Sequence, residues 1–306
     1  MANLEFDVVY EGSESVVTIT NLKPLTEYTF KVRFGFLCEN STVWSQTYGE
    51  LKVQTCDESQ VNKAILQLIR AVQENDSPKV ASLIEEFGAQ LSMAARDKNG
   101  RTLPMIAAQQ GNTDIMRLLI ANGADLKSTT QAGKTALSIA ITNSQYEVVK
   151  QLLLQDKTLA SHTDINGVTM LMLAAENSIF AFRKGYETKI LQEIIDAGVD
   201  LNQEDMNGAT ALDRLCTSCG LTDAADWLIS HGALVVNTVS KKHPLTHLML
   251  AAMNGHGPLC TYLLENHRGD PFMKSEHGIT ALSFAESANH RGVIAILTKA
   301  MKSEPL

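Results

Sequence analysis

The stretch DKNGRTLPMIAAQQGNTDIMRLLIANGAD, residues 97–125, sets out a pattern that returns at 130–154 and again at 164–202. Each copy opens with a Gly-x-Thr turn and closes with a run of leucine, isoleucine or valine. Six threonines mark the same phase along the chain: Thr102, Thr135, Thr169, Thr210, Thr246 and Thr280. Their spacings are 33, 34, 41, 36 and 34 residues. A period in this range indicates supersecondary units that stack on one another as a solenoid.

Each recurring residue type has a local physical reason. A glycine such as Gly100, two places before the threonine, allows the positive φ of a tight turn. The hydroxyl of Thr102 is suited to accept from an unpaired N–H at the start of the helix that follows. The pair Ala107 and Ala108 keeps the first helix thin, so that neighbouring units can approach. Gly123 is suited to end the second helix in the left-handed conformation.

A turn and two helices at a period near 33 residues resembles the ankyrin repeat family. That resemblance implies a mostly α fold, an ankyrin-repeat solenoid of about six to seven helix-turn-helix repeats with short hairpin tips. It also implies that the tips and the first helices form a concave face, and that this face binds protein. The family's Thr-Pro-Leu-His opening does not occur in this chain; Thr210-Ala-Leu-Asp213 is one of its replacements.

Residues 4–55 follow a different period. Apolar residues alternate with polar ones at 6–10, 17–19, 28–34 and 51–53, which predicts short antiparallel strands. The segment LKPLTEYTFKV, residues 22–32, resembles the fibronectin type III pattern, in which Tyr28 would tie back to the backbone at a corner of a β-sandwich. We therefore expect a small β-module ahead of the repeats.

This β-module is too short for the whole fibronectin type III fold, which has seven strands. The corner segment arrives by residue 28, so the first strands of that fold lack sequence. We expect a small, incomplete antiparallel β-sandwich. Either the chain begins at an internal start codon, or a partner supplies the missing strands.

Changes in composition along the chain indicate the domain boundaries. We expect a partial fibronectin type III-like module at 1–56, a polar linker at 57–62, the ankyrin repeats at 63–302 and a tail at 303–306. The expected repeats span 63–96, 97–129, 130–163, 164–204, 205–238, 240–274 and 275–302. The repeat at 164–204 is longer because it holds an insert, IFAFRKG at 179–185. Inserts in solenoids form loops, so this one is a candidate contact site or a locally packed longer helix.

The charge of the chain narrows the class of partner. With 26 Lys and Arg against 34 Asp and Glu, the net charge is −8, whereas nucleic-acid and anionic-membrane surfaces need a basic footprint. The five cysteines are scattered and odd in number, which indicates a reducing compartment. We expect a soluble intracellular chain in the cytosol or nucleus, or at a cilium or basal body.

Motifs for chemistry are weak. Cys216 and Cys219 form a lone CxxC where small core residues of a first helix belong. His243 and His247 are four residues apart, and no carboxylate stands at a matching sequence position. Phosphate-binding, nucleophile-elbow and dinucleotide motifs do not occur in the sequence. We expect no catalytic residue, no cofactor and no metal site.

The residues that we predict to bind protein lie at the hairpin tips and in the insert. Because they mix charged, amide and apolar side chains, they match the composition of protein interfaces; for any one of them, a merely solvated turn is the competing interpretation. They are Lys98, Asn99, Arg101, Gln131, Lys134, Ile165, Asn166, Met206, Asn207, Glu276 and His277 at the tips, and Phe180, Phe182 and Arg183 in the insert.

The order of modules adds one resemblance. A fibronectin type III module followed directly by ankyrin repeats is similar to a family of animal proteins associated with germ cells and ciliated cells. It implies a protein–protein interaction adaptor, a monomeric array without direct nucleic-acid or membrane contact, with a role in germ-cell differentiation or in transcriptional and apoptotic regulation. The alternatives are a structural component of a ciliary or microtubule assembly and an enzyme, and the sequence offers no nucleophile or metal set for the latter.

Overall fold

The computed structural model describes the backbone of residues 27–32, 35–38, 41–44, 49–54, 58–88, 95–183, 186, 188–237, 239, 244–266 and 269–303, with side chains from Asn62 onward. The chain divides into two compact units, Met1–Gln67 and Leu68–Leu306. The division falls inside the first helix, α1, and each unit is described by itself.

In the described residues of the first unit, the strands are β1 (Glu27–Val32), β2 (Gly35–Cys38), β3 (Ser41–Trp44) and β4 (Gly49–Gln54). β1 pairs antiparallel with β4, with Tyr28 opposite Val53, and β2 pairs antiparallel with β3. Among the described residues these are two separate two-stranded sheets. The strands predicted at 28–34 and 51–53 correspond to β1 and β4; those predicted at 6–10 and 17–19 lie outside the described residues.

Two separate ladders are not a sandwich, which requires two sheets packed face to face. The described strands therefore do not support the predicted fibronectin type III module, and its Tyr28 corner remains a prediction. Alternation along a strand indicates which residues share a face, but it does not specify which strand pairs with which.

The predicted linker at 57–62 also differs from the structure, because α1 begins at Glu58. Its first residues are polar, yet glutamate and glutamine favour helix nearly as well as leucine does. Polarity alone therefore could not distinguish a linker from the solvated first turns of a helix.

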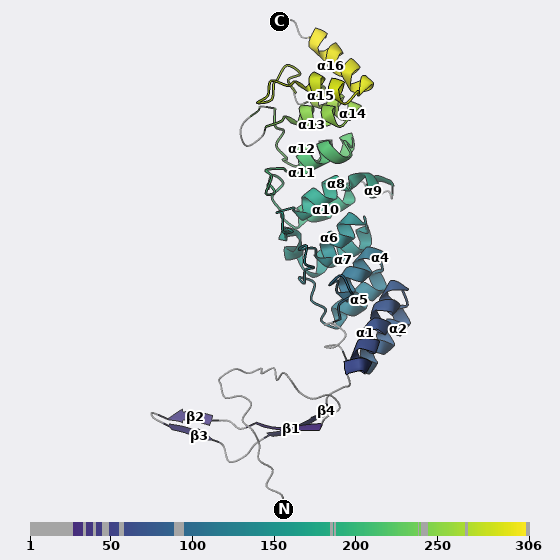
Figure 1. Cartoon of the computed structure of the whole chain (residues 1–306), viewed down its shortest axis with the longest axis vertical. Coiled ribbons are helices and arrows are strands. Elements are labelled where there is room, and N and C mark those ends of the chain that lie inside the picture. Colours follow the sequence, from purple (N-terminus) through teal and green to yellow (C-terminus); the bar gives the residue numbers. More distant parts are fainter. Residues whose placement is uncertain are drawn as a thin grey trace, which may run out of the picture. The chain divides into compact units, whose positions relative to one another are not determined.

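The second unit is mostly helical, and its helices come in pairs. Helix pairs follow one another in sequence order along the unit (Figure 1). In the described residues they are α1 (Glu58–Gln73) with α2 (Ser77–Phe87), α4 (Leu103–Gln110) with α5 (Thr113–Ala121), α6 (Ala136–Thr142) with α7 (Tyr146–Gln155), α8 (Met170–Glu176) with α10 (Lys189–Asp196), α11 (Ala211–Ser218) with α12 (Thr222–Ser230), α13 (His247–Met253) with α14 (Gly257–Asn266), and α15 (Ala281–Ser287) with α16 (Arg291–Ser303).

The first helices form one row and the second helices another. In the first row α4 contacts α6, α6 contacts α8, and the row continues through α11 and α13 to α15. Ala107 and Ala108 are fully buried between such neighbours, as predicted for thin first helices. Since each pair buries its apolar face only against adjacent pairs, the core is a continuous strip along the unit. The exact limits of the seven expected repeats remain a prediction.

The predicted helix starts are confirmed. All six phase-marking threonines are N-caps whose Oγ1 accepts from the backbone N–H three residues on, for example Thr135 from Ser138 at 3.2 Å. The turn glycines also behave as predicted: Gly100 has φ +72° and Gly133 has φ +73°. Gly123, just past the end of α5, has φ +78°.

We expect Thr135→Ala to lower the free energy of unfolding by about 1 kcal/mol, the usual effect of losing an N-cap hydroxyl. Ser138 would lose the acceptor of its backbone N–H inside a buried turn. Thr129→Ala, at an exposed position one turn earlier in the chain, is the matched control. Urea unfolding of both variants tests the cap, and equal midpoints for the two would contradict it.

Side chains at the start of the second helices reach back to the preceding repeat. Nε2 of Gln145 donates to the carbonyl of Gln109 at 3.2 Å, and Nε2 of His290 lies 3.1 Å from the carbonyl of Met253. The glycine that follows the contacted helix leaves room for each of them; a Cβ on Gly255, for example, would lie 2.7 Å from Nδ1 of His290. These contacts couple neighbouring repeats in addition to apolar packing.

Candidate functional site

A side-chain oxygen organises each hairpin tip. In the first, Oδ1 of Asp97 accepts from the backbone N–H of Asn99 at 2.9 Å and of Arg101 at 2.8 Å. Gly100 then turns the chain at positive φ, and Arg101 returns a carbonyl to the N–H of Asp97 at 3.0 Å. This Asx-type turn holds Lys98 and Asn99 at its outer end, because their own side chains take no part in it.

The other tips repeat this construction. Oδ1 of Asp164 accepts from Asn166 and Val168, and Oδ1 of Asp205 accepts from Asn207 and Ala209. Thr130 and Ser275 supply a hydroxyl oxygen in the same place. The turn glycines were predicted from the recurring pattern, whereas this role of the carboxylates was not. The signal was present as Asp-x-x-Gly at 97, 164 and 205.

The predicted tip residues are accessible to a partner. Apart from Arg101, which is half-buried, all are exposed: Lys98, Asn99, Gln131, Lys134, Ile165, Asn166, Met206, Asn207, Glu276 and His277. Exposure is necessary for binding but does not itself show binding, so the assignment of these residues to an interface remains a prediction.

A groove brings five of the predicted residues together. It has a volume of about 600 Å³ and lies between the tips of two successive repeats and the first helices α4 and α6. We call it the inter-tip groove. Its lining residues are Lys98, Asn99, Gly100, Arg101, Gln109, Thr130, Gln131, Ala132, Lys134, Ile139, Thr142 and Asn143. The sequence placed Lys98 and Lys134 on different tips, and stacking of the repeats places them around one depression.

Arg101 is one of the residues that line the inter-tip groove. Its guanidinium lies 2.7 Å from Oδ2 of Asp97 and donates to Oε1 of Gln109 on α4. Burial acts to raise the pKa of Asp97, but the N–H groups and charge of Arg101 and the N–H of Asn99 outweigh it, so the pKa lies below its ordinary value. Asp97 is therefore a carboxylate at neutral pH and offsets the charge of Arg101.

The central tips are apolar at their ends. Ile165 and Met206 are 60% and 76% exposed. Their tips contact each other, since the N–H of Met206 donates to the carbonyl of Asn166 at 3.0 Å. Nε2 of His162 lies 2.9 Å from the carbonyl of Gly133. This contact connects the preceding tip, which contains Gly133, to the tip of Ile165. The row of tips is thus continuous from Lys134 to Met206.

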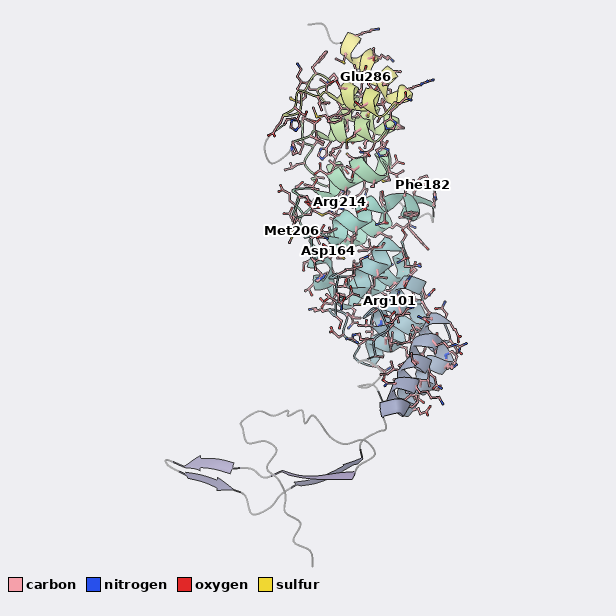
Figure 2. All side chains as sticks on the ribbon, viewed as in Figure 1. Arg101, Asp164, Phe182, Met206, Arg214 and Glu286 are labelled. Carbon is pink, nitrogen blue, oxygen red and sulfur yellow. The ribbon has the colours of Figure 1, made fainter. Side chains whose placement is uncertain are left out.

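The insert forms a helix of its own, α9 (Ser178–Arg183). Ala181 is buried, whereas Phe180 and Phe182 are 50% and 44% exposed and Arg183 is exposed. Figure 2 shows Phe182 on the opposite side of the second unit from Met206. The structure therefore does not join the insert residues to the tip residues in one site.

An aromatic stack holds the chain just after α9. Tyr186 stacks on Tyr146 of α7 with ring centroids 5.0 Å apart, and Nζ of Lys189 lies 5.7 Å and 5.9 Å from the two centroids. Burial, followed by the hydrogen bond to Glu193, raises the pKa of the Tyr146 phenol. Sequence reasoning missed this anchor because its two rings are 40 residues apart in the chain.

Two charged contacts behind the tips were also missed. Arg214 of α11 lies 2.6 Å from Asp205 and 3.3 Å from Glu176. Burial acts to raise the pKa of Asp205, but Arg214 and two backbone N–H groups lower it overall. This ion pair connects the Asp205 tip to the first helices α8 and α11.

The expectation that no carboxylate matches His247 is corrected by the structure. Its Nε2 lies 3.0 Å from Oδ1 of Asp213, which belongs to the preceding repeat. Nδ1 of His247 accepts from the N–H of Val236 at 2.8 Å, so the ring proton is assigned to Nε2. Asp213 occupies the place of histidine in the family's opening pattern, and the stacking of α11 on α13 brings the pair together.

Among the described residues, the remaining candidates for catalysis or metal binding do not gather into a site. Cys216, Cys219 and Cys260 are free thiols, and burial raises the pKa of Cys216 and, to about 12, that of Cys260. In the described part of the chain, His, Cys, Asp and Glu do not gather in a group of three that could hold a metal ion. Nor does any described helix combine the length and apolar character needed to cross a bilayer.

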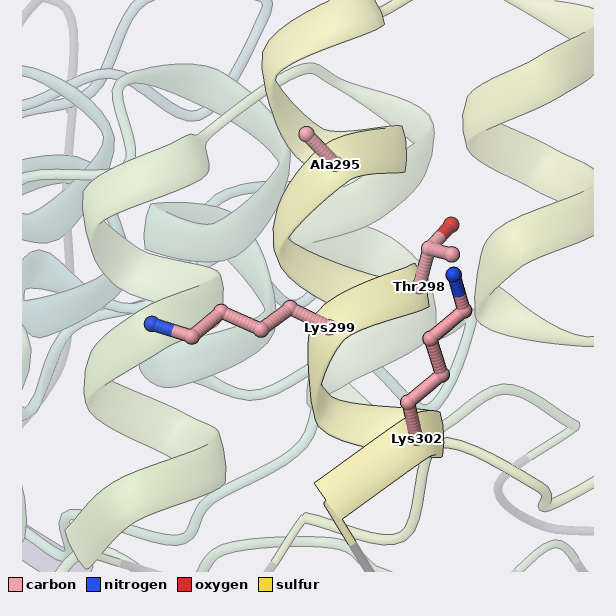
Figure 3. A pocket seen from close by; sticks show the side chains of 4 residues that line it. All are labelled: Ala295, Thr298, Lys299 and Lys302. Carbon is pink, nitrogen blue, oxygen red and sulfur yellow. The ribbon is translucent and has the colours of Figure 1, made fainter.

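A second depression lies on α16 and has a volume of about 550 Å³. It is lined by Ala295, Thr298, Lys299 and Lys302, all from this one helix. The two lysines extend in different directions (Figure 3), so they do not converge on one ligand atom.

Known proteins share the repeat region. The family model described as ankyrin repeats (3 copies) matches residues 68–161. Ankyrin repeat and KH domain-containing protein mask-1 of Caenorhabditis elegans is 29% identical over 221 residues, covering 72% of this chain and 8% of that protein. Putative ankyrin repeat protein YahD of Escherichia coli is 25% identical over 201 residues, covering 64% of this chain and 94% of YahD.

A third relative belongs to another class of protein. The transient receptor potential cation channel subfamily A member 1 homolog of C. elegans is 30% identical over 207 residues, covering 66% of this chain and 16% of the channel. Apart from YahD, the match therefore spans a small fraction of these relatives. What they share with this chain is the repeat region, and the match does not extend to the remainder of the larger proteins.

Proposed function

We propose that this chain, which carries ankyrin repeats, is a non-catalytic adaptor that binds a protein partner through its hairpin tips and first helices. Ankyrin repeats mediate binding to other proteins. The observation that carries the proposal is the inter-tip groove, because two successive tips and two first helices contribute side chains to one depression.

The chemistry of the groove suits recognition of a polypeptide. It offers cationic, amide and hydroxyl groups around two aliphatic residues, Ala132 and Ile139. Such a lining makes hydrogen bonds and ion pairs to a partner while burying a limited apolar area, as the rim of a protein interface does. The Asx-type turns hold the tips in shape before binding, which lowers the entropy lost on association.

A setting in germ cells or ciliated cells, with intracellular residence, is the finer part of the proposal. It rests on the sequence alone, in which residues 22–32, ahead of the repeats, resemble the first module of that animal family. Salt-resistant fractionation with axonemes would favour the structural alternative, whereas release with the readily extracted proteins would favour an adaptor.

The adaptor proposal is tested by photocrosslinking in cells. A photoreactive phenylalanine analogue replaces Asn99 or Gln131 at the groove and, as matched controls, the exposed residues Arg117 of α5 or Lys150 of α7 on the second helices. We expect discrete crosslinked partners from the groove positions only. The same proteins crosslinked in equal yield from the second helices, or none from the groove, would overturn the proposal.

A further inference from the structure

We propose that the inter-tip groove receives an extended acidic peptide segment, with side-chain carboxylates against Lys98 and Lys134 and an apolar residue further along against Ile165. This inference rests on the proposed function and names the chemical class of its partner.

The first observation that supports an acidic ligand is the charge of the groove. Its twelve lining residues include two lysines and one arginine and no carboxylate. Asp97 offsets the charge of Arg101, while Lys98 and Lys134 are exposed and have no ion-pair partner in the described residues. In a chain of net charge −8, this is a local positive potential that attracts anionic groups and repels cationic ones.

The second observation, which supports a peptide, is the pair of amide side chains in the groove. Asn99 is the third residue of its tip and Gln131 the second residue of the next, and both are exposed. Each carboxamide offers two N–H donors and one acceptor oxygen. An extended peptide presents unpaired backbone N–H and C=O groups along its length, so it matches both the donors and the acceptor of such amides. A small carboxylate only accepts hydrogen bonds and would leave the amide oxygens unpaired.

The spacing of the repeats predicts the spacing in the partner. Packed helices lie about 8–10 Å apart, and an extended chain in the polyproline II conformation advances about 3.1 Å per residue and returns to the same side every three residues. Successive tips therefore correspond to about three residues of a bound segment. Lys98 is the second residue of its tip and Lys134 the fifth residue of the next, an offset that the long lysine side chains can span. Carboxylates that reach both should therefore be about three residues apart.

The continuous row of tips predicts the apolar residue. Past Lys134, the next tip presents Ile165, and the backbone N of Ile165 would lie 3.0 Å from a Cβ on Gly133, which shows how closely the two tips approach. The tip after that presents Met206. A segment that continues in the same direction meets aliphatic side chains, so an apolar residue about three to six places beyond the second carboxylate would be buried there.

The test selects random twelve-residue peptides displayed on phage against the full chain and against its Lys98→Glu/Lys134→Glu variant. We expect the parent to enrich Asp or Glu three residues apart, followed by an apolar residue. The variant should enrich Lys or Arg at those two places instead. Lys150→Glu, an equal change of charge on the second helix α7, should enrich the same peptides as the parent.

Binding measurements with a fluorescent copy of the most enriched acidic peptide give the dissociation constants of the parent and its variants. Each of Lys98→Glu and Lys134→Glu should weaken binding about tenfold, and raising the salt concentration should weaken binding to the parent, because the contacts are charged and lie near the surface. Lys150→Glu should leave the affinity within about twofold, the usual size of a remote surface charge effect.

The outcomes separate the inference from the proposed function. Enrichment of neutral or basic peptides, or of none, together with partner crosslinks at Asn99, would overturn the acidic segment and leave the adaptor standing. Equal displacement of the peptide by a single-stranded oligonucleotide would assign the groove to polyanions and overturn the inference. Crosslinks absent from the groove would overturn both.

Discussion

Gly220→Ala is expected to lower the free energy of unfolding of the α11–α12 repeat by about 3 kcal/mol, the sum of a left-handed backbone and a steric clash. Gly220 follows α11 at φ +58°. A Cβ placed there would lie 2.5 Å from Cβ of His256, the side chain that reaches back from the next repeat. Since Cβ cannot rotate away, the backbone itself has to shift.

The repeat that holds Gly220 has its own reporter. In a Trp44→Phe background, Trp227 of α12 is the only tryptophan in the sequence. Its ring stacks on His231 with centroids 4.0 Å apart, so its fluorescence reports on this repeat. Urea unfolding followed by the fluorescence of this tryptophan measures the decrease in the free energy of unfolding for this repeat. A local probe is needed because repeat arrays need not unfold in one step.

Gly123→Ala is the matched control for the backbone. Gly123 has φ +78°, yet a Cβ there would meet nothing within 4 Å. We expect a loss of about 1 kcal/mol from conformation alone. Adding His256→Ala to Gly220→Ala should restore part of the loss, because it removes the ring atoms Cγ and Nδ1, which would also clash, while Cβ of His256 remains. Equal losses for Gly220→Ala and Gly123→Ala would show that the close approach of His256 has no energetic effect.

Asp213→Ala is expected to lower the free energy of unfolding by about 3 kcal/mol, since the buried donor groups of Thr210 and His247 then lose the carboxylate that faces them. One oxygen of Asp213 accepts from the backbone N–H and the hydroxyl of Thr210, both at 2.8 Å. The other faces Nε2 of His247, a residue that is 0% exposed. No aligned hydrogen bond accompanies that 3.0 Å approach among the described atoms, so we treat it as an electrostatic contact.

The effect of Asp213→Ala should depend on pH. Burial acts to raise the pKa of Asp213, but His247 and Thr210 outweigh it and lower the pKa below its ordinary value. A lowered pKa in the folded state means that the carboxylate stabilises the fold above the unfolded pKa, about 4, and that this contribution is lost as the pH falls through the folded pKa. The difference between parent and variant should therefore be full at pH 7 and shrink below pH 4.

Asp223→Ala is the control for the acid effect, because Asp223 is an exposed residue in the first turn of α12. It should cost about 0.5 kcal/mol, the usual scale of a helix-dipole contact. Trp227 fluorescence in urea at pH 3 and pH 7 gives both comparisons. A loss for Asp213→Ala that stays constant over this range would assign it to helix capping geometry and not to the carboxylate's charge.

The local features of each repeat could be predicted from the sequence alone. The threonine caps, the positive-φ turn glycines and the buried alanine pairs depend on residues within a few positions of one another, so a recurring pattern suffices to predict them. Exposure of the tips was predictable for the same reason. The linker and the sandwich were not, because polar composition and strand alternation do not specify helix starts or strand partners.

The contacts between repeats were decided by tertiary structure. His247 meets Asp213, and His256 occupies the space beside Gly220, only because α13 packs on α11 and α14 packs on α12 in one register. Residues 34 or 36 positions apart carry no mark of facing each other. Sequence alone therefore determined the repeat and its exposed tips, while the stacking of repeats determined which of those side chains share a groove, since that depends on a packing geometry that no local pattern encodes.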